Sequence, residues 1–359
     1  MVRPSYVLGG RAMEIVLEKK QLRNFVQEAF NAAEKNPILI DKFIDNAMEV
    51  DVAAISDGKQ VFVAGVMQHI EEAGIHSGDS ACSLPPVSIK PFLIKEIENQ
   101  TKKLSLALKV KGFMNVQFAI KQDKIYVIEV NPRASRTVPF VSKAKDLPLA
   151  QIASRVMAGE KLSNFNLKSK TKKMFAVKEA VFPFNKFPNS DVLLGPEMKS
   201  TGEVMGFDKN FGMAFAKSQI AASNSLPIKG LAFISLKNSH KEEGVELAKE
   251  LKKLNFYLCG TKGTAKYISK HGIKCKTINK VNQGSPHIVD VLNAKKIALV
   301  INTGGGNSET QLSDAVALRR ATLANKVPYC TNMSTAKVCI EGIKSLNSKD
   351  ITVTSLQDI

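Results

Sequence analysis

The pattern of hydrophobic and polar positions changes about two thirds of the way along the chain. In the first part, short runs rich in β-branched residues alternate with longer helical stretches. Residues Val50–Ser56 and Gln60–Met67 flank the turn signal Asp57-Gly58-Lys59 and predict a β-hairpin. Residues Phe113–Lys121 and Ile125–Asn131 predict a second hairpin in the same way.

Other segments of this first part carry weaker patterns. Apolar residues recur at helical spacing within Ser88–Lys109 and predict an amphipathic helix. A second helix is expected at Asp146–Ala158, and a polar, lysine-rich loop at Leu162–Lys173. Residues Pro37–Ile40 start a strand that we expect to run toward Ile44.

After a linker-like segment at Ala221–Lys229, strands and helices alternate strictly. This order predicts a parallel sheet covered by helices on both faces. We therefore expect a domain boundary at about residue 228, which gives domains 1–228 and 229–359. The expected elements are strands at Leu231–Leu236, Phe256–Cys259 and Ile297–Asn302, and helices at Lys241–Leu254, from Gly263-Thr264 onward, and at Thr310–Ala324.

Composition excludes several classes of protein. Of the 359 residues, 44% are hydrophobic and 23% are charged, which is a globular balance. The absence of a run of eighteen apolar residues argues against a membrane span, and the N-terminus has no secretory pattern, so we expect a cytoplasmic protein. The five cysteines form no CxxC pair and are interpreted as reduced core thiols.

The formal net charge of +18 is consistent with a nucleic-acid partner, an anionic ligand or an acidic partner. The lysines are spread along the chain and are not interleaved with aromatic residues in one basic stripe. This distribution favours a general lysine bias over nucleic-acid binding.

The second hairpin carries the most informative chemistry. If its loop consists of Gln122–Lys124, then Gln117 faces Glu129 and Asn115 faces Asn131, on one face of the sheet. Amide oxygens with few carboxylates suit Mg²⁺ that is held jointly with phosphates. A hairpin with one solvated face explains the same spacing equally well.

Two further segments have the composition of ligand-binding loops. Arg3-Pro4-Ser5 followed by Gly9-Gly10-Arg11 brings small residues and two arginines together, although a turn before a helix is the simpler interpretation. The segment Glu71–Ser80 contains acids, glycines, hydroxyls and His76, and suits a ribose or a cationic ligand. A lone histidine such as His76 is more often a satisfied loop residue than a catalyst.

Together these segments resemble carbamoyl phosphate synthetase, large chain, and specifically its second ATP-grasp unit. The resemblance continues through Thr137–Lys143, Pro183–Pro188 and Leu194–Met198 and covers essentially the whole chain. It implies an α/β and α+β protein with a partial ATP-grasp fold followed by a Rossmann-like parallel-sheet regulatory domain. That second domain resembles the methylglyoxal-synthase-like (MGS-like) domain of the same family.

The resemblance also assigns roles to individual residues. Residues implied to contact ATP are Arg3, Lys42, Ile44, Glu49, Gly74, Ile75, His76, Ser77, Gln117 and Glu129. The implied metal ligands are Gln117, Glu129 and Asn131, and Arg133 and Arg136 would address phosphoryl or carbamate oxygens. Residues implied to bind an ornithine-like activator are Glu71, Asp79 and Glu179. Lys42 departs from the family pattern, which has a histidine there, and would use only its backbone.

In the regulatory domain the resemblance implies a phosphate pocket. Its residues would be Lys241, Thr261, Lys262, Gly263, Thr264, Lys280 and Asn302. Thr261–Thr264 lies between a predicted strand and a helix N-terminus, where a phosphate binds well. The stretch Asn302–Gly306 has fewer hydroxyls than the family pattern, which leaves the effector open between a uridine nucleotide and another ligand. A glycine-rich turn without any ligand is the alternative.

The implied activity is ATP-dependent phosphorylation of carbamate to carbamoyl phosphate, made from bicarbonate and glutamine-derived ammonia for pyrimidine and arginine synthesis. The implied cofactors are Mg²⁺ or Mn²⁺, two per ATP site, with K⁺ as a further candidate. The implied partners are a glutaminase small chain, the rest of the large chain, a uridine nucleotide, an ornithine-like activator and further copies of this chain in a homo-oligomer. Nucleic acids and membranes are not expected as partners.

The chain is about a third as long as the family's large chain and is expected to be a C-terminal portion that lacks the N-terminal lobe of its ATP-grasp unit. A cleft closed from one side would lose binding energy and water exclusion, so the chain alone is a candidate for inactivity. Two alternatives remain: an inert effector-binding fragment, and an ATP-grasp ligase of the biotin carboxylase type.

Overall fold

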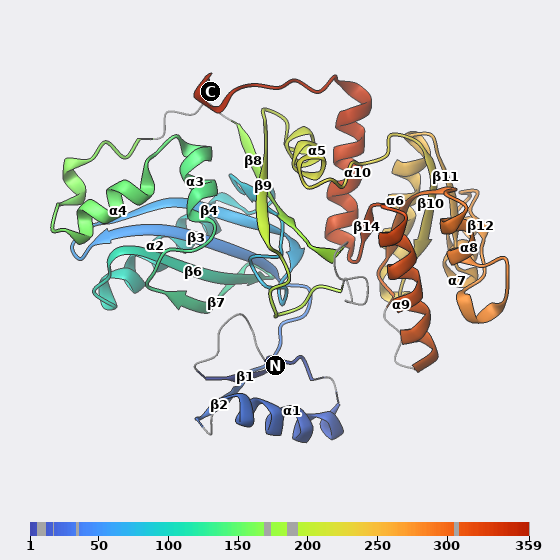
Figure 1. Ribbon diagram of the computed structural model, residues 1–359, viewed down its shortest axis with the longest axis horizontal. Coiled ribbons are helices and arrows are strands. Elements are labelled where there is room, and N and C mark those ends of the chain that lie inside the picture. Colours follow the sequence, from blue (N-terminus) through green and yellow to red (C-terminus); the bar gives the residue numbers. More distant parts are fainter. Residues whose placement is uncertain are drawn as a thin grey trace. The chain divides into compact units, whose positions relative to one another are not determined.

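The computed structural model describes residues 1–5, 12–16, 18–33, 36–168, 174–184, 193–304 and 309–358 (Figure 1). The chain divides into two compact units. The first unit comprises Met1–Thr171 and Leu194–Thr201, and the second comprises Lys172–Leu193 and Gly202–Ile359. The domain boundary expected at residue 228 stays a prediction.

The first unit is built on an antiparallel sheet with the strand order β7-β6-β3-β4-β5. The strands are β3 (Met48–Asp57), β4 (Val61–Glu72), β5 (Cys82–Leu84), β6 (Lys111–Lys121) and β7 (Lys124–Asn131). Both predicted hairpins, β3–β4 and β6–β7, are confirmed.

Alternation along these strands separates two faces of the sheet. One face is apolar and packs Val52, Val116 and Phe118 against Leu93 and Ile97. The last two residues belong to α2 (Pro91–Ala107), which confirms the helix predicted in Ser88–Lys109. The opposite face carries the polar residues of the hairpin, and it is the face on which a site can form.

Two short helices follow the sheet. Helix α3 (Val138–Lys145) was not predicted, and helix α4 (Leu149–Met157) starts three residues later than expected. The reason is that Asp146 ends α3 in a left-handed conformation, with φ of 49°. The expected loop at Leu162–Lys173 begins with one 3₁₀ turn, Leu162–Asn164, and its residues 169–173 lie outside the described ranges.

A small subdomain precedes the sheet, formed by β1 (Val2–Pro4), α1 (Lys19–Ala32) and β2 (Ile38–Ile40). Strands β1 and β2 pair antiparallel. The prediction that the second strand runs toward Ile44 is wrong. Its pairing ends where Asp41 N donates to Met1 O (2.9 Å), and the chain then turns so that Phe43 contacts Gly74.

The second unit begins with the antiparallel pair β8 (Phe175–Val181) and β9 (Gly202–Asp208), followed by α5 (Phe211–Ala221). None of these three elements was predicted. Residues 224–229 then have no helix or strand, as expected for a linker.

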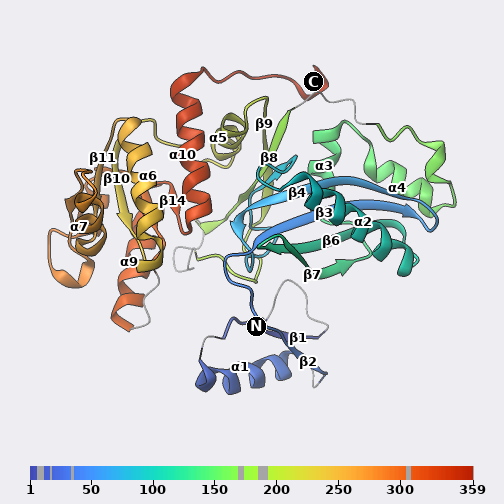
Figure 2. The same cartoon turned by 180° about the vertical axis from the view of Figure 1, so that it is seen from behind.

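The rest of the second unit is a five-stranded sheet in the order β12-β11-β10-β13-β14, and neighbouring strands run parallel (Figure 2). Its strands are β10 (Gly230–Ser235), β11 (Phe256–Gly260), β12 (Lys276–Thr277), β13 (Ile297–Asn302) and β14 (Tyr329–Cys330). Its helices are α6 (Lys241–Lys253), α7 (Lys262–Lys270), α8 (Ile288–Asn293), α9 (Glu309–Ala324) and α10 (Met333–Ser348). The predicted β-α alternation is confirmed.

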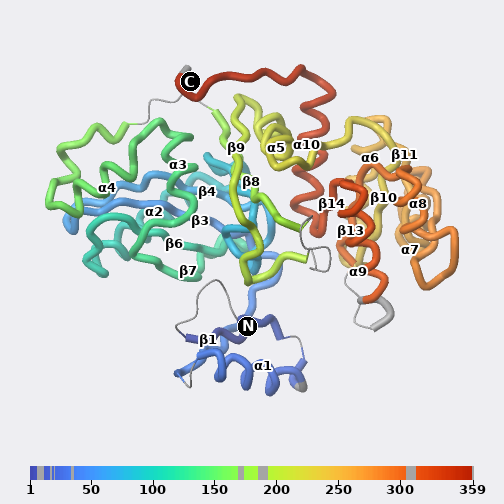
Figure 3. The backbone as a smooth tube through the Cα atoms, in the orientation of Figure 1, coloured from blue at the N-terminus to red at the C-terminus, as the bar shows by residue number. Residues whose placement is uncertain are grey.

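Both faces of this sheet are buried. Phe233 and Val300 pack with residues of α8 and α9, while their strand neighbours Ile234 and Ile301 point to the other face and are also fully buried. The tube view shows α10 following β14 at the end of the chain's β-α series (Figure 3). Within the described ranges, no helix is both long and apolar enough to cross a membrane.

Candidate functional site

The β6–β7 hairpin has the predicted register at its polar positions, but this register does not come from the three-residue loop that the sequence suggested. Gln117 faces Glu129 and Asn115 faces Asn131. The connecting turn contains only Gln122 and Asp123, both with positive φ (50° and 61°), so the three-residue loop was wrong. A bulge at Ile128, between the pairs of Gln117 and Phe118, adds the residue that the turn lacks and restores the register.

Oxygen donors gather on the polar face of β3, β6 and β7. Asp51 lies opposite Gln117 on the neighbouring strand, and the Asn115 amide donates to Asp51 Oδ1 and to Val52 O (3.3 Å). On β7, the Asn131 amide donates to Glu129 Oε1 at 2.8 Å. Asp51 and Asn115 are buried, so a carboxylate and its amide partner sit inside this face of the sheet.

These donors fit a hard divalent cation. Carboxylate and amide oxygens are the ligand types that Mg²⁺ accepts when phosphates supply the rest of its coordination. Among the described residues, no group of three or more His, Cys, Asp or Glu is placed to hold a metal ion. Sequence reasoning missed Asp51, although an acidic residue in the apolar run Val50–Ser56 was a visible signal.

A hydrogen bond joins the loop after β4 to the hairpin. Gln117 Nε2 donates to Ser77 Oγ at 2.9 Å, so a predicted metal ligand holds a residue predicted to lie beside the nucleotide. His76 shapes the loop through its side chain and its backbone. Its ring Nδ1 accepts from Gly78 N (3.0 Å), and its backbone N–H donates to Gly195 O (2.8 Å). His76 is therefore a structural residue of this loop.

Gly74 sets the direction of the same loop. Its φ is +109°, and a Cβ at this position would lie 3.0 Å from Phe43 Cζ. Both the backbone conformation and the close ring require glycine. Ile75, which follows, is half-buried.

Glu49, another predicted ATP contact, is buried on β3 beside His69 of β4. Glu49 Oε1 and His69 Nδ1 are 3.7 Å apart, and both side chains are at most 5% exposed. A carboxylate held this deeply has a fixed position at the edge of the polar face. Sequence reasoning did not identify His69.

The two arginines that follow β7 are exposed. Arg136 Nη1 lies 2.6 Å from Met198 Sδ and 3.4 Å from Ser200 Oγ, which steers the guanidinium along the 194–201 segment. Arg133 Nη1 donates to Ala134 O at 3.1 Å. Exposed guanidinium groups just beyond the oxygen donors suit the binding of anionic oxygens.

The remaining predicted ATP contacts lie in the small subdomain. Arg3 Nη1 pairs with Asp41 Oδ2 at 3.3 Å, Lys42 is exposed and Ile44 is half-buried. The structure places these three residues on or after the β1–β2 sheet, not on the sheet that contains β3, β6 and β7. Gly9, Gly10 and Arg11 lie outside the described residues.

The three carboxylates predicted for an activator are all held by N–H donors. Glu71 Oε2 accepts from Ala81 N at 2.7 Å, and the two oxygens of Asp79 accept from Lys199 N and Ser200 N at 2.8 Å each. In the second unit, Glu179 Oε2 accepts from the Gln219 amide at 2.5 Å. The buried Asp79 therefore anchors the 199–200 backbone whether or not it also meets a ligand.

A separate cavity of about 490 Å³ opens at the carboxyl ends of β10, β11 and β13. The structure brings all seven residues of the predicted phosphate pocket to its walls, namely Lys241, Thr261, Lys262, Gly263, Thr264, Lys280 and Asn302. Sequence reasoning missed Ser235, Lys237 and Asp314, which also line it. Among the described lining residues, four lysines stand against one carboxylate, which makes the cavity suitable for an anion.

Local hydrogen bonds set the shape of the cavity floor. Thr264 Oγ1 accepts from Leu236 N at 3.0 Å, which ties the start of α7 to the end of β10. Thr261 precedes α7, whose N-terminal N–H groups face the cavity end of the sheet. Lysine charges and a helix N-terminus together favour a phosphate group here.

The opposite wall is formed after β13. Asn302 Nδ2 donates to Tyr329 OH (3.1 Å), and its Oδ1 accepts from Gly304 N (3.2 Å). Next to it, His240 Nδ1 and Thr303 Oγ1 are 3.1 Å apart. Burial and the nearby Lys237 lower the pKa of His240 from 6.5, despite the opposing charge of Glu243. Gly305 and Gly306 lie outside the described residues.

Comparison with known families matches both units. A family model described as the carbamoyl-phosphate synthase L chain, ATP binding domain, matches residues 1–165. A second model, the MGS-like domain, matches residues 243–331. The hairpin and its loop fall within the first match, and much of the cavity wall falls within the second.

Curated relatives extend the match over the whole chain. The carbamoyl phosphate synthase large chain, C-terminal section, of Aquifex aeolicus (strain VF5) is 48% identical, over 100% of this chain and 71% of the relative. The large chain of Acidobacterium capsulatum is 50% identical, over 99% of this chain and 33% of the relative. The chain thus spans about a third of the longer relatives.

A fold comparison gives a weaker match to solved structures. The biotin carboxylase domain of the Hydrogenobacter thermophilus 2-oxoglutarate carboxylase, solved with MgADP, ADP and bicarbonate, is 16% identical, with a TM-score of 0.47. The match covers 59% of this chain and 54% of that structure.

Proposed function

The chain belongs to the carbamoyl phosphate synthase large-chain family as a C-terminal part with an ATP-binding and an MGS-like domain, and we propose that it phosphorylates carbamate with ATP. The product would be carbamoyl phosphate for pyrimidine and arginine synthesis. The observation that carries this proposal is the position of Glu129 opposite Gln117, with Gln117 bonded to the loop residue Ser77.

The residues of the hairpin would hold a divalent cation and the ATP phosphates. Glu129, Gln117 and Asn131 would supply the metal's oxygen ligands, and Asp51 would fix Asn115 beside them. Mg²⁺ bound here would neutralise the charge of the β- and γ-phosphates. Mn²⁺ in the same place, a second metal ion and a K⁺ ion belong to the same proposal.

Arg133 and Arg136 would stabilise charge on the transferring phosphoryl group as a carbamate oxygen attacks the γ-phosphorus in line. The P–O bond to ADP breaks as the new P–O bond forms, so no covalent protein intermediate is required. The loop from Gly74 to Ser77, fixed by Gly74 and by the Gln117 bond, would position the nucleotide.

Partners and effectors follow from the family and from the cavity. A glutaminase chain would supply ammonia, and the rest of the large chain would complete the enzyme in the cytoplasm. We assign a uridine nucleotide to the cavity of the second unit because its lysines suit a phosphate. Glu71 and Asp79 in the first unit are proposed contacts of an ornithine-like activator, and Glu179 in the second unit is a separate candidate.

The reverse reaction tests this function directly. Carbamoyl phosphate and Mg·ADP should yield ATP and carbamate, with ATP measured by luminescence. The chain is assayed alone and mixed with the separately produced remainder of a large chain. Activity in the mixture that Glu129→Gln abolishes and Glu160→Gln retains supports the proposal. Glu160 is the matched control because its carboxylate pairs with Arg155 on the surface.

Two results would contradict the proposal. ATP formation that persists in Glu129→Gln would exclude the hairpin as the metal site. A mixture that binds uridine monophosphate but never forms ATP would identify the chain as an effector-binding module.

A further inference from the structure

Two of the five cysteines touch each other in the second unit. All five are buried and free in this structure. Cys330 lies on β14 and Cys339 lies on α10, and the Cys330 thiol donates to Cys339 Sγ at 3.4 Å. Their exposed fractions are 1% and 4%, so the protein encloses the pair. Neither residue is among the described lining residues of the cavity, and the proposed function gives the pair no role.

Two other cysteines of the same unit have a different environment. Cys259 on β11 donates to Ala232 O at 3.6 Å, so its hydrogen points to a carbonyl and not to a thiol. Burial raises the pKa of Cys259 to about 12 and that of Cys275 to about 11. Because the thiolate is the reactive form of cysteine, these two side chains are poor nucleophiles near neutral pH. They are therefore internal controls for the pair.

The backbone holds the two sulfur atoms against each other. Cys330 lies opposite Ile301 in the parallel pair β13–β14, which fixes it at the edge of the five-stranded sheet. A short connection leads from β14 into α10, where Asn332 caps the helix by accepting from Thr335 N at 2.8 Å. Cys339 lies in the second turn of this helix, so both thiols belong to regular elements and not to a loop.

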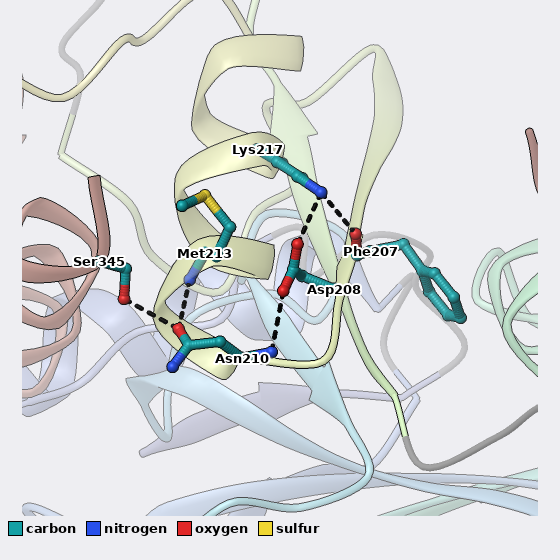
Figure 4. A network of polar contacts seen from close by, with 6 residues as sticks. All are labelled: Phe207, Asp208, Asn210, Met213, Lys217 and Ser345. Carbon is teal, nitrogen blue, oxygen red and sulfur yellow. Dashed lines mark hydrogen bonds and ion pairs between the residues drawn. The ribbon is translucent and has the colours of Figure 1, made fainter. Parts of the chain in front are cut away.

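Helix α10 is anchored at its other end as well. Ser345 Oγ donates to Asn210 Oδ1 at 2.8 Å, and Asn210 is also the residue that caps α5 (Figure 4). A Cβ on Gly212 of α5 would lie 2.6 Å from Glu341 O, so the two helices are in close contact at their backbones. This packing holds α10 against sliding along its axis and keeps the two thiols in contact.

A buried hydroxyl lies on the same side of α10 as Cys339. Helical side chains at i and i+4 share a face and lean toward the N-terminus, which relates Cys339 to Thr335. Thr335 Oγ1 is buried and has no hydrogen-bond partner in the part of the chain that the structure describes. Such a hydroxyl is a donor available to a charge that forms on this face. A thiolate at Cys339 would form there and would also accept from the Cys330 thiol.

We propose that Cys330 and Cys339 are a redox-sensitive disulfide site that takes a low-molecular-weight disulfide as its oxidant and locks β14 to α10. The Cys339 thiolate attacks one sulfur of the small disulfide, whose S–S bond breaks and releases one small thiolate. The Cys330 thiolate then attacks Cys339 Sγ in the mixed disulfide, the protein S–S bond forms, and the second small thiolate leaves. Each small thiolate takes up a proton that a protein thiol has lost. Two protein thiols are thus oxidised while one small disulfide is reduced to two thiols.

The geometry favours the second step over the first. Sulfur atoms that already touch need only a small side-chain rotation to reach the about 2.05 Å of a disulfide bond. The small disulfide, in contrast, meets a buried thiol only when the edge of the sheet opens locally. Strand β14 (Tyr329–Cys330) is short and lies at the end of the strand order, next to β13, and such an edge opens more readily than a central strand. The mixed disulfide should therefore be short-lived in the wild type.

Peptide mapping of the intact 359-residue chain tests the site without any substitution. The chain is incubated with oxidised glutathione, quenched with acid, unfolded, alkylated and digested with trypsin. Cleavage after Lys337 separates the two cysteines into the peptides 327–337 and 338–344. We expect these two peptides to be joined by a bond that dithiothreitol breaks, while the other three cysteines are alkylated.

Substitutions assign the role of each residue. Cys330→Ala removes the resolving thiol, so glutathione should stay attached to Cys339. Cys339→Ala should abolish both the link and any adduct on Cys330. Cys259→Ala removes another buried cysteine of the same sheet and, as the matched control, should keep the link. Thr335→Val removes a donor to the attacking thiolate and should slow linking about fivefold.

The closed ring should also stabilise the second unit. A disulfide restricts the unfolded chain, so the oxidised wild type should unfold about 5 °C above the reduced wild type. Dithiothreitol should return the unfolding midpoint to its reduced value. Cys330→Ala treated with the same oxidant should show no rise.

Four results would overturn the proposal. The first is the absence of a link between the two peptides after oxidation. The second is a link that forms only in chains unfolded with urea, or a bond between other cysteines in its place, because the folded contact would then be unreactive. The third is a link that leaves the unfolding midpoint unchanged, since β14 and α10 would not be locked by it. The fourth is a Cys330→Ala chain without glutathione on Cys339, which would exclude the order of attack.

Discussion

Gln117 Nε2 donates to Ser77 Oγ across 2.9 Å and thereby joins the β6–β7 hairpin to the loop that follows β4. Gln117 also lies opposite Glu129 in the β6–β7 ladder. The amide nitrogen of Gln117 therefore holds the loop, and its oxygen takes no part in this bond. In the proposed site, metal binding by Gln117 would therefore depend on the position of this loop.

We expect Ser77→Ala to weaken Mg·ATP binding. The variant leaves the Gln117 amide without its hydroxyl acceptor, and a hydrogen bond of this kind is worth about 1 kcal/mol, or roughly fivefold in Kd. Calorimetry with Mg·ATP measures the change. Ser88→Ala is the control. It removes the same kind of bond, a glutamine amide donating to a serine hydroxyl (Gln68 Nε2 to Ser88 Oγ, 2.8 Å), at another place in the first unit. If Ser77→Ala and Ser88→Ala bind Mg·ATP with the same Kd, the Ser77 bond has no role in nucleotide binding.

Gly74→Ala should destabilise the first unit and disturb the loop. Alanine at φ of +109° is strained by about 1–3 kcal/mol, and its Cβ would press on Phe43. Gly159→Ala separates the two effects, because Gly159 has φ of +105° but nothing within 4 Å of its Cβ position. Thermal unfolding should show a larger loss for Gly74→Ala, and Mg·ATP affinity should fall in that variant alone. Identical losses would mean that the Phe43 contact is unimportant.

Lys280→Gln should weaken binding of uridine monophosphate about tenfold or more. A charge-assisted hydrogen bond to phosphate contributes about 1.5–3 kcal/mol, and Lys280 is one of four lysines that line the cavity. The loss should shrink at high salt, because salt screens the charge that the variant removes. Lys274→Gln removes an exposed lysine that is absent from the cavity lining and serves as the control. A Kd unchanged by Lys280→Gln would place the phosphate elsewhere.

The stability of the chain should depend on His240 below pH 6.5. Burial and Lys237 lower the pKa of His240 in the folded protein, so the unfolded chain binds a proton more readily as the pH falls through 6.5. Stability should therefore rise with pH across this window and level off above it. Denaturant unfolding of the wild type and of His240→Asn measures the effect, and their difference should vary only below about pH 6.5. A difference that is constant from pH 5 to pH 8 would contradict it.

The sequence predicted that Gln117 faces Glu129 from strand alternation together with an assumed three-residue loop, and the pairing is correct although the loop is not. It could not predict how the register arises, since Ile128, the bulged residue, looks like any apolar strand residue. The parallel sheet was predictable from its buried strands and short β-α connections, and the phosphate pocket followed from the resemblance.

Helix α5 was missed for a physical reason. Seven of its residues are buried, including Gly212, Ala214 and Phe215, so no polar stripe marks a helical period. Its link to α10 depends on contacts between segments more than a hundred residues apart, as in Asn210 and Ser345. Such long-range contacts leave no local pattern.

The β6–β7 hairpin is the proposed Mg·ATP site of the first unit. Calorimetric titration of Mg·ATP into the wild type, Glu129→Gln and Glu160→Gln tests this assignment. Glu129→Gln keeps an oxygen for the Asn131 amide and removes only the charge. We predict saturable binding in the wild type and in Glu160→Gln, with affinity at least about tenfold lower in Glu129→Gln, equal to about 1.4 kcal/mol. Wild-type affinity in Glu129→Gln, or no binding to the wild type, would contradict the account.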